Sequence, residues 1–336
     1  MKAIGYRHNH AVDPAHALED LTLPAPTPGA RDLLVRVKAV SVNPVDVKVR
    51  RNRPATADKP EVLGWDAVGT VESVGADVQG FKAGDRVYYA GSITRPGANS
   101  ELHVVDERIA AHAPRSLEDG QAAALPLTSI TAWELLFDRL RVPQGGGAGQ
   151  SLLVVGGAGG VGSILIQLAR KLTQLTVIAT ASRPETRDWC LALGAHAVID
   201  HSQPLSQALK DGGHAPVDYV AALTHTESHY AQIIESLKPQ GAMAVIDDMA
   251  VLDAMKLKGK SLSLHWEMMF ARSMYETPDM AEQGRLLAEV ARLVDAGTLR
   301  TTASAHYGTI NAANLLRAHA FVESGKAQGK VVLEGF

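Results

Sequence analysis

Glycines at a regular spacing indicate a site that binds phosphate groups. Residues 157–162 read GAGGVG, which fits the pattern GxGxxG, and they stand between an apolar run at 151–155 and a helical stretch. In this order of strand, tight turn and helix the pattern is typical of dinucleotide binding, with a glycine-rich structural turn as the alternative. We expect Gly157 to allow the turn, Gly159 to let the backbone approach a pyrophosphate, and Gly162 to let helix and strand pack closely. Because a helix N-terminus donates N–H groups to phosphates, the candidate cofactor-binding residues of this loop are Gly157, Gly159, Gly160, Val161 and Gly162.

The end of the next apolar strand bears on which dinucleotide is bound. An Asp or Glu about 20 residues past the glycine pattern would bind the ribose 2′-hydroxyl of NAD. This chain has Ser182 and Arg183 there, with Arg187 one helical turn later. Arginine pairs with a phosphate that an acidic side chain would repel. We therefore expect NADP(H) as the cofactor, with Ser182, Arg183 and Arg187 at its 2′-phosphate; the alternative is that both arginines are solvated helix residues.

The elements around this loop alternate in a way that predicts a parallel sheet. After residue 125, six short apolar runs alternate with helical segments, at 152–155, 176–180, 197–199, 217–222, 242–246 and 261–264. Continuous apolar strands suit a sheet that is buried on both faces, and the alternation implies βαβ crossovers. Before residue 125, Gly- and Pro-rich turns separate strands at 33–40, 69–78, 85–90 and 101–105. That part of the chain is typical of an antiparallel or barrel-like β domain, so we predict an α/β protein of two domains.

Composition and charge argue against several classes of partner. The 336 residues carry 33 Lys plus Arg against 36 Asp plus Glu, a net charge of −3. A nucleic-acid or anionic-membrane partner would need a concentrated positive field. No apolar run approaches the roughly 18 residues of a membrane span. The first ten residues lack the apolar core of a secretion signal. Within them, residues 8–10 (HNH) are expected to form a surface turn. The single cysteine, Cys190, forbids an intrachain disulfide. We expect a cytoplasmic protein.

Five further segments resemble the medium-chain dehydrogenase/reductase superfamily in their residues and order: 43–46 (NPVD), 64–71 (GWDAVGTV), 84–87 (GDRV), 127–133 (LTSITAW) and 329–333 (GKVVL). The branch that the chain resembles most is the quinone oxidoreductase-like proteins, often labelled zinc-type alcohol dehydrogenase-like. The resemblance implies a GroES-like β domain formed by residues 1–126 and 267–336. It implies a Rossmann domain, with a doubly wound parallel six-stranded sheet, at residues 127–266. It also implies a homodimer that pairs through the last Rossmann strand, whose edge would otherwise be exposed.

The positions that bind zinc in related enzymes carry other residues here. Zinc-using relatives have a cysteine at the place of Asn43, a His–Glu pair at the place of Trp65 and Asp66, and another cysteine near Leu127. Tryptophan and leucine cannot ligate zinc, which needs thiolate, imidazole or carboxylate. A four-cysteine structural site is excluded because Cys190 is the single cysteine. We therefore expect no metal at these positions.

The resemblance also implies roles for residues outside the glycine-rich loop. Without zinc, hydrogen-bond donors must meet the charge that develops on a substrate carbonyl oxygen, and Asn43 is the first candidate because its amide can donate. Thr128 and Thr131 are expected to position the nicotinamide, and Lys330 matches a cationic position near the pyrophosphate. Trp65 is expected either to line the substrate pocket or to pack in the core. Asn43, Trp65 and Thr131 are thus the candidate catalytic residues.

Other polar groups leave two interpretations open. Asp46 and Asp66 are either proton carriers or structural hydrogen-bond acceptors. His225 and His229, four residues apart near a helix start, are either metal ligands or a polar helix entry, and they lack the HExxH order. The segment 265–270 (HWEMMF), expected to follow the last strand, either closes the substrate pocket or lines a structural or subunit contact.

These features together predict a metal-free, NADPH-dependent oxidoreductase that reduces quinones or α,β-unsaturated carbonyls (enones) by hydride transfer. The final proton would come from water, because no residue is convincingly placed as a general acid. A zinc-type alcohol dehydrogenase is a second hypothesis, and the replaced ligands count against it. A third is a non-catalytic NADPH-binding protein with a structural or sensor role, because hydride chemistry belongs to the cofactor and leaves few obligatory protein residues.

Overall fold

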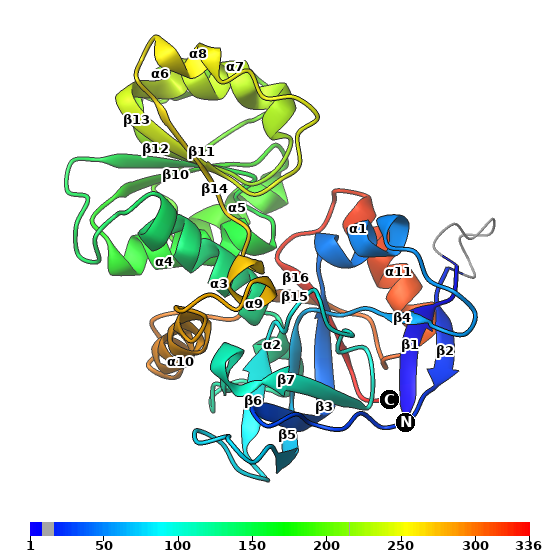
Figure 1. Cartoon of the computed structure of the whole chain (residues 1–336). Coiled ribbons are helices and arrows are strands. Elements are labelled where there is room, and N and C mark those ends of the chain that lie inside the picture. Colours follow the sequence, from blue (N-terminus) through cyan, green and yellow to red (C-terminus); the bar gives the residue numbers. More distant parts are fainter. Residues whose placement is uncertain (9–16, 215) are drawn as a thin grey trace. The chain divides into compact units, whose positions relative to one another are not determined.

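The computed structural model describes residues 1–8, 17–214 and 216–336 (Figure 1). The chain forms two compact units: unit 1 comprises Met1–Ile130 and Phe270–Phe336, and unit 2 comprises Thr131–Met269. Of the expected surface turn at 8–10, Asn9 and His10 lie outside the described residues. The predicted α/β fold is confirmed, since unit 2 holds a parallel sheet and unit 1 consists mainly of antiparallel strands.

Unit 2 is organised around the predicted six-stranded parallel sheet. Its strand order is β11-β10-β9-β12-β13-β14, so the chain winds outward from β9 in both directions, as in a doubly wound sheet. The strands are β9 (Ser151–Val155), β10 (Thr176–Thr180), β11 (Ala197–Ile199), β12 (Val217–Ala222), β13 (Leu237–Val245) and β14 (Ser263–Trp266). The helices that follow them are α4 (Gly160–Leu172), α5 (Pro184–Ala192), α6 (Leu205–Asp211), α7 (Thr226–Ser236) and α8 (Met255–Lys258). Figure 1 shows α4 on one face of the sheet and α6, α7 and α8 on the other, which is why the central strands are apolar throughout.

The last strand of this sheet begins and ends two residues later than its expected range, 261–264. His265 and Trp266 pair with Ala244 and Val245 of β13, so they belong to β14 and not to the segment after it, as the sequence pattern suggested. β14 is the edge strand and only partly buried, and its side chains therefore need not be apolar. This exposure explains why periodicity alone placed the end of the strand too early.

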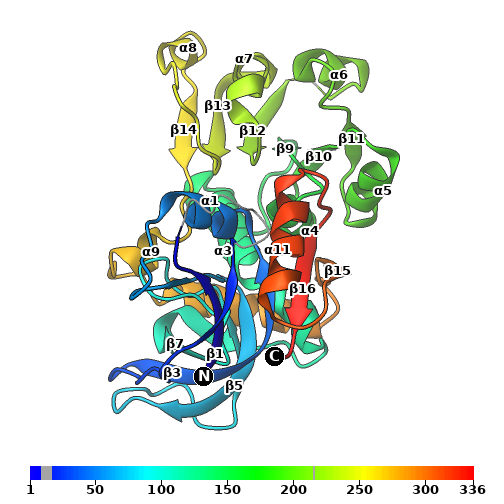
Figure 2. The same cartoon turned by 90° about the vertical axis from the view of Figure 1, so that its right-hand side faces the viewer.

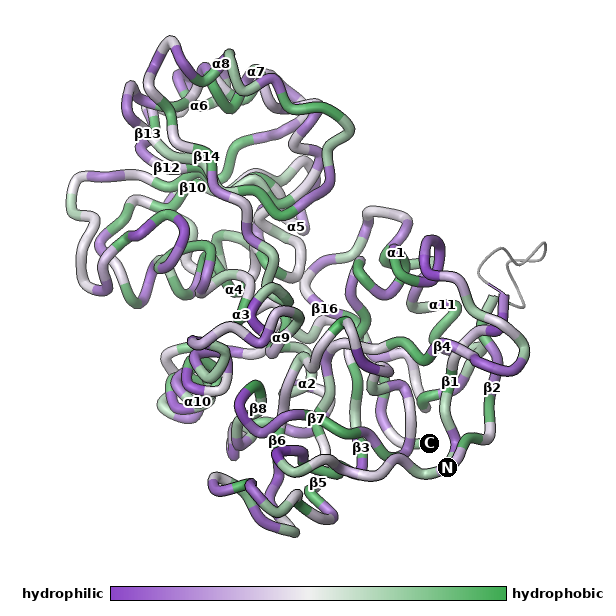
Figure 3. Tube along the Cα trace, in the orientation of Figure 1, coloured by the Kyte–Doolittle hydropathy of each residue, from purple (hydrophilic) through white to green (hydrophobic). Residues whose placement is uncertain are grey.

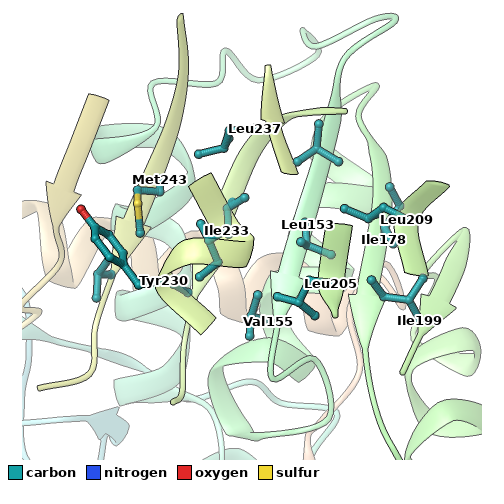
Figure 4. Close-up of a cluster of buried hydrophobic side chains, with 14 of the residues drawn as sticks. Leu153, Val155, Ile178, Ile199, Leu205, Leu209, Tyr230, Ile233, Leu237 and Met243 are labelled. Carbon is teal, nitrogen blue, oxygen red and sulfur yellow. The ribbon is translucent and has the colours of Figure 1, made fainter. Parts of the chain in front are cut away.

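One hydrophobic core of unit 2 lies between this sheet and the helices on one of its faces (Figure 4). Leu153 and Val155 of β9 meet Leu205 and Leu209 of α6 and Ile233 of α7, and all five side chains are buried. Burying such side chains is worth roughly 1.5–3 kcal/mol each. The packing therefore fixes the strand ends at the carboxyl edge, where the glycine-rich loop begins.

Unit 1 contains two sheets. The larger is a seven-stranded sheet in which β15-β16-β3-β5-β6-β8 are neighbours and β7 also pairs with β3. Its strands are β3 (Asp32–Val42), β5 (Ala67–Val74), β6 (Arg86–Tyr89), β7 (Leu102–Asp106), β8 (Ala110–His112), β15 (Ala303–His306) and β16 (Lys330–Glu334). The smaller sheet has the order β2-β1-β4, with β1 (Lys2–Tyr6), β2 (Glu19–Thr22) and β4 (Glu61–Val62). Because β16 pairs antiparallel with β3, the end of the chain lies beside its first part.

The helices of unit 1 cover these sheets, and α1 lies beside α11 (Figures 1 and 2). They are α1 (Pro44–Asn52), α2 (Asp119–Ala123), α9 (Ala271–Met274), α10 (Glu282–Asp295) and α11 (Ala312–Glu323), with a short 3₁₀ turn η2 (Glu107–Ile109). Figure 3 shows hydrophilic and hydrophobic residues mixed along α10, whose Leu286, Leu287 and Val290 are buried. Helix α3 (Pro126–Trp133) runs across the boundary between the units and continues into a π-helical turn, η3 (Glu134–Arg139). None of the helices in the described ranges is long and apolar enough to cross a bilayer.

Candidate active site

The glycine-rich loop has the strand–turn–helix form that the sequence predicts, but a different glycine makes the turn. Gly156, directly after β9, has φ +87°, a left-handed conformation that favours glycine. A Cβ atom there would stand 2.7 Å from Cγ2 of Thr224. Gly157 does not have a positive φ and instead packs closely against its neighbours. A Cβ atom added to Gly157 would lie 2.7 Å from the Cβ of Ala179 and 3.1 Å from the Sγ of Cys190. The turn role expected of Gly157 therefore belongs to Gly156.

The two remaining glycines of the motif have the environments that their expected roles need. A Cβ on Gly162 would lie 2.5 Å from the carbonyl oxygen of Gly156 and 2.6 Å from that of Gly157, so only glycine lets α4 approach the loop this closely. A Cβ atom added to Gly159 would have one neighbour within 4 Å, the carbonyl oxygen of Gly156, at 3.5 Å. The space above Gly159 is thus open to a ligand. Gly160 and Val161 follow in the first turn of α4, where N–H groups have no partner within the helix. This cradle fits a pyrophosphate.

Side chains from neighbouring elements hold the loop in this shape. The Gly156 N–H donates to Oγ1 of Thr180, at 3.0 Å, at the end of β10. On the other side, the hydroxyl of Ser163 donates to the Ala158 carbonyl at 3.3 Å and accepts from the Trp189 indole N–H at 2.8 Å. The sequence pattern does not indicate a role for Thr180 or Ser163, although a hydroxyl residue directly after the glycine motif is a usable signal for Ser163.

The three residues expected at the 2′-phosphate differ in their surroundings. Ser182 is exposed after β10, and Arg183 is the N-cap residue of α5, with its Nε 3.3 Å from the Glu185 carboxylate. Arg187, one turn on, donates from Nη1 to the Val198 carbonyl of β11, at 2.7 Å. Part of the Arg187 guanidinium is therefore engaged by the sheet edge, whereas Ser182 and Arg183 stand at the strand end where the motif predicts them.

A second group of candidate residues forms a buried polar cluster in unit 1. Asn43 caps α1: its N–H donates to Oδ2 of Asp46 at 2.6 Å. Its amide Nδ2 donates to Oδ2 of Asp66 at 2.8 Å, with longer contacts of 3.3 Å to the Trp65 carbonyl and 3.4 Å to that of Ser41. Asn43 is 1% exposed. The short bond to Asp66 sets the orientation of the amide.

Lys330 joins this cluster from β16. Its ammonium donates to Oδ1 of Asn43, to Oδ2 of Asp66 at 3.0 Å, and to the Val42 carbonyl at 3.0 Å. The two charged side chains are 4% and 0% exposed. Lys330 is thus placed against Asn43 and Asp66, a different set of partners from the pyrophosphate that the resemblance implies.

The two aspartates serve as hydrogen-bond acceptors in this cluster. Asp66 also accepts from the Leu127 N–H at 2.7 Å, and Asp46 also accepts from the Gly64 N–H at 3.1 Å. Burial raises the pKa of Asp66, and the ammonium of Lys330 opposes that rise. Burial likewise raises the pKa of Asp46, to about 7, against the N–H of Asn43. The geometry favours the structural interpretation of both residues.

The remaining positions do not fit a zinc ion. Trp65 is 1% exposed, donates its indole N–H to the Ser92 carbonyl at 3.2 Å, and meets Phe270 edge-on with ring centroids 6.2 Å apart. These contacts favour core packing for Trp65. Leu127 offers an apolar side chain, and a lysine ammonium already contacts the oxygens of Asn43 and Asp66. In the part of the chain that the structure describes, no group of three His, Cys, Asp or Glu side chains is arranged to hold a metal. His225 is the left-handed residue that precedes α7, and His229 lies within that helix.

Helix α3 carries the two threonines expected at the nicotinamide. Thr128 donates from Oγ1 to the Leu125 carbonyl at 3.2 Å and is 2% exposed; Thr131, one turn later, is 5% exposed. Residues three apart lie on one face of a helix. The structure therefore groups the candidates in two sets: Asn43, Trp65 and Lys330 with the start of α3 in unit 1, and the glycine-rich loop with Ser182 and Arg183 in unit 2.

Comparisons with known proteins place this architecture in a family. Residues 29–115 match the alcohol dehydrogenase GroES-like domain, and residues 193–333 match the zinc-binding dehydrogenase model. A zinc-type alcohol dehydrogenase-like protein of Staphylococcus aureus is 38% identical over 338 residues, 99% of each chain. A crystal structure from Rhizobium etli, described as a zinc-dependent alcohol dehydrogenase protein, is 55% identical with a TM-score of 0.96, over 100% of this chain and 98% of that one. Escherichia coli quinone oxidoreductase, complexed with NADPH, is 26% identical with a TM-score of 0.83, over 99% of this chain and 100% of that one. This chain is an oxidoreductase of the medium-chain dehydrogenase/reductase superfamily and belongs to its quinone oxidoreductase-like branch.

Proposed function

We propose that this protein is a cytoplasmic, NADPH-dependent reductase that transfers hydride to quinones or α,β-unsaturated carbonyls without a zinc ion. The observation that carries the proposal is a contrast between the two units. The loop that cradles a pyrophosphate is intact in unit 2, whereas the zinc-ligand positions of unit 1 hold a buried ammonium–amide–carboxylate cluster. A reductase that needs no Lewis acid fits both halves of this contrast.

Binding of the cofactor would rest on unit 2. Open space above Gly159 and the N–H groups of Gly160 and Val161 suit the pyrophosphate, and Arg183 suits the 2′-phosphate. When bound, NADPH supplies the hydride. The similarity to an Escherichia coli quinone oxidoreductase complexed with NADPH supports this choice of cofactor over NADH.

The chain's own contribution at the reacting carbonyl would come from Asn43 and Thr131. The Asn43 amide donates to Asp66 at 2.8 Å and makes longer contacts of 3.3 and 3.4 Å with the Trp65 and Ser41 carbonyls, and in this proposal a substrate oxygen takes the place of one of the longer contacts. The Lys330 ammonium against Oδ1 polarises the amide and makes it a better donor. Thr131 would position the nicotinamide, and water would supply the final proton.

We also propose that the protein is a homodimer that pairs along β14. This strand is the edge of the six-stranded sheet, and Trp266 at its end and Met268 just beyond it are 53% and 46% exposed. A second copy pairing edge to edge would satisfy the open strand and cover these side chains.

The test is NADPH oxidation by the purified protein, measured with quinones, with enones, and without acceptor. We expect turnover with at least one of the two acceptor classes. Alcohol oxidation with NADP+ that is lost on chelation, in the absence of quinone or enone turnover, would instead establish the zinc-type alcohol dehydrogenase. NADPH binding without turnover of any acceptor would establish the non-catalytic alternative.

A further inference from the structure

The turn of the glycine-rich loop lies between two threonines. Thr180, at the end of β10, accepts the Gly156 N–H with its hydroxyl at 3.0 Å and the Gly157 N–H with its carbonyl at 3.2 Å. Thr224, which follows β12, is on the other side, since a Cβ atom added to Gly156 would lie 2.7 Å from its Cγ2. A group that is bonded to either threonine is therefore next to the turn that begins the phosphate-binding loop.

A histidine is hydrogen-bonded to each of these threonines. His201, which follows β11, has its Nδ1 3.0 Å from the hydroxyl oxygen of Thr180. His225, which precedes α7, has its Nδ1 2.8 Å from the hydroxyl oxygen of Thr224. His229, one turn later in α7, brings a third imidazole, and its ring centroid is 6.3 Å from that of His201. These three side chains form a histidine group at the carboxyl edge of the sheet.

The register of the sheet places His201 beside the residues expected at the 2′-phosphate. In the parallel pairing of β10 with β11, Thr180 is opposite Ile199. His201 follows Ile199 by two residues, as Ser182 follows Thr180, so His201 and Ser182 extend neighbouring strands by the same length. A positive charge on His201 would therefore attract the phosphates of a dinucleotide bound at this edge.

Without a ligand, the surroundings of the histidine group favour neutral imidazoles. Burial lowers the pKa of His201; Asp200 opposes this shift, and His225 adds to it. Burial lowers the pKa of His229 as well, and here His201 and His225 add to the shift while Asp247 opposes it. Since an ordinary histidine has a pKa of about 6.5, His201 and His229 are neutral at pH 7 in the free protein.

The two carboxylates that face the histidine group are engaged by other donors. Asp200 accepts the Ser202 N–H at 2.8 Å, and Asp247 accepts the N–H of Thr226, at 2.9 Å, together with its hydroxyl. A nucleotide phosphate monoester carries a charge of about −1.5 to −2 at pH 7. A bound dinucleotide would thus add negative charge that the free protein does not supply.

We propose that His201 is a proton-linked residue of the cofactor site: a bound dinucleotide phosphate draws a proton onto its imidazole, and the resulting positive charge tightens the binding of NADP(H). This role rests on the proposed function. Because the phosphate favours the charged imidazole, the pKa of His201 is higher in the complex than in the free protein. Between these two pKa values the complex holds a proton that the free protein lacks, so the Kd falls as pH falls.

Uptake of the proton leaves the turn in place. The hydroxyl of Thr180 has one hydrogen to donate and can accept two hydrogen bonds. It accepts from Gly156 in both states, and it either donates to the neutral Nδ1 of His201 or accepts from the protonated one. The expected change is therefore one of charge beside the loop, which a pH profile can separate from a structural defect.

The experiment measures the Kd for NADP+, which is stable in acid, by titration calorimetry from pH 7.5 to 5.5. The proteins are wild type, His201→Asn, His229→Gln and the control His196→Asn. Asparagine keeps an oxygen near the place of Nδ1 and does not take up a proton in this range. His196 is the matched control because it lies at the other end of β11, where its Nδ1 accepts the Val177 N–H at 2.9 Å.

The comparison between proteins carries the result, because the 2′-phosphate itself has a pKa of about 6 and affects all of them equally. The Kd of His201→Asn relative to that of wild type should rise at least about fivefold from pH 7.5 to 5.5, and the same ratio for His196→Asn should stay constant. Binding enthalpies in buffers of different ionisation enthalpy should show greater proton uptake in wild type than in His201→Asn. In His229→Gln the proton-linked fall of the Kd should begin at higher pH, because a neighbouring imidazole that repels the charge is gone. If His201→Asn does not fold, this shift decides the question.

Each contrary result overturns a distinct step. Parallel pH profiles in wild type and His201→Asn, at whatever separation, would overturn the proton linkage and leave His201 with a structural contact to Thr180 alone. Loss of the pH dependence in His196→Asn as well would also overturn it. An unchanged profile in His229→Gln would overturn the coupling between the imidazoles. Failure of wild type to bind NADP+ at any pH would overturn the proposed function and the role of His201 with it, whereas binding with parallel profiles overturns that role alone.

Discussion

Replacing Lys330 by methionine would test the buried cluster that stands at the zinc-ligand positions. Methionine keeps much of the apolar stem and removes the ammonium, which donates to Asn43, Asp66 and Val42. Asp66, with a 0% exposed side chain, would then be a buried carboxylate without a cation. Breaking a buried ion pair by removing one partner costs about 3–5 kcal/mol. For a unit of this size, 1 kcal/mol corresponds to roughly 2–4 °C, so the melting temperature of unit 1 should fall by about 6–20 °C.

Scanning calorimetry at pH 8 would measure this loss, with Lys238→Met as the matched control. Lys238 forms the same type of pair with Asp218, at 2.9 Å, but its side chain is 39% exposed, so its loss should cost about 1 kcal/mol or less. The double variant Lys330→Met with Asp66→Asn should be more stable than Lys330→Met alone, because an amide removes the unpaired charge. Since burial raises the Asp66 pKa and Lys330 no longer opposes it, the deficit of Lys330→Met should also grow as pH rises from 5 to 8. A loss no larger than that of Lys238→Met, or a double variant no more stable than Lys330→Met, would refute the reasoning.

Four other predictions concern the cofactor, the reaction, the metal and the assembly. A charge-assisted contact with the 2′-phosphate is worth about 1.5–3 kcal/mol, so NADPH should bind about ten- to a hundredfold tighter than NADH. Ala181→Asp should reverse part of that preference, while the control Ala181→Asn should not. Equal affinities of the wild-type protein for the two cofactors would contradict this prediction. Asn43→Ala should lower enone turnover by at least about tenfold with little change in NADPH affinity, and an unchanged rate with both acceptor classes would remove Asn43 from the site. Elemental analysis should find no stoichiometric zinc, and chelators should leave turnover intact; one tightly held zinc per chain would contradict the interpretation of Asn43 and Trp65. Light scattering should show a dimer, with a stable monomer at micromolar concentration as the contrary result.

The local features of unit 2 could be predicted from sequence because short-range patterns determine them. A strand that is buried on both faces must be apolar along its whole length, which locates β9, β10, β11 and β12 within a residue or two. The edge strand β14 does not follow this rule. Because it is only partly buried, His265 and Trp266 can continue its hydrogen-bonded pairing with β13. The sequence cannot distinguish Gly156 from Gly157 as the turn residue, because two adjacent glycines are equivalent in sequence. Only the backbone angle of +87° separates them.

The partners of Lys330 could not be predicted by periodicity, because they are distant in sequence. Lys330 and Asn43 are 287 residues apart, and the antiparallel pairing of β16 with β3 brings them together. A usable signal was nevertheless present: Lys330 opens the apolar run at 330–333, and Asp66 lies beside the apolar residues 67–68. A charge within an apolar strand is expected to have a partner of opposite charge. Two such residues of opposite sign therefore predict a contact between their side chains, which the structure shows at 3.0 Å, although β3 separates β16 from β5 in the sheet.

The same argument applies to two buried glutamates of unit 2, Glu134 and Glu267, where the signs are equal. Glu134 follows an apolar helical stretch and Glu267 precedes the run at 268–270 (MMF), so both were recognisable as buried acids. Two buried acids cannot neutralise each other, and they demand either a cation or a proton. Arg139, five residues after Glu134, supplies one positive charge. Burial and the charge of Glu134 raise the pKa of Glu267, and Arg139 opposes that rise. The cation that two buried acids need thus comes from the same stretch of chain as Glu134.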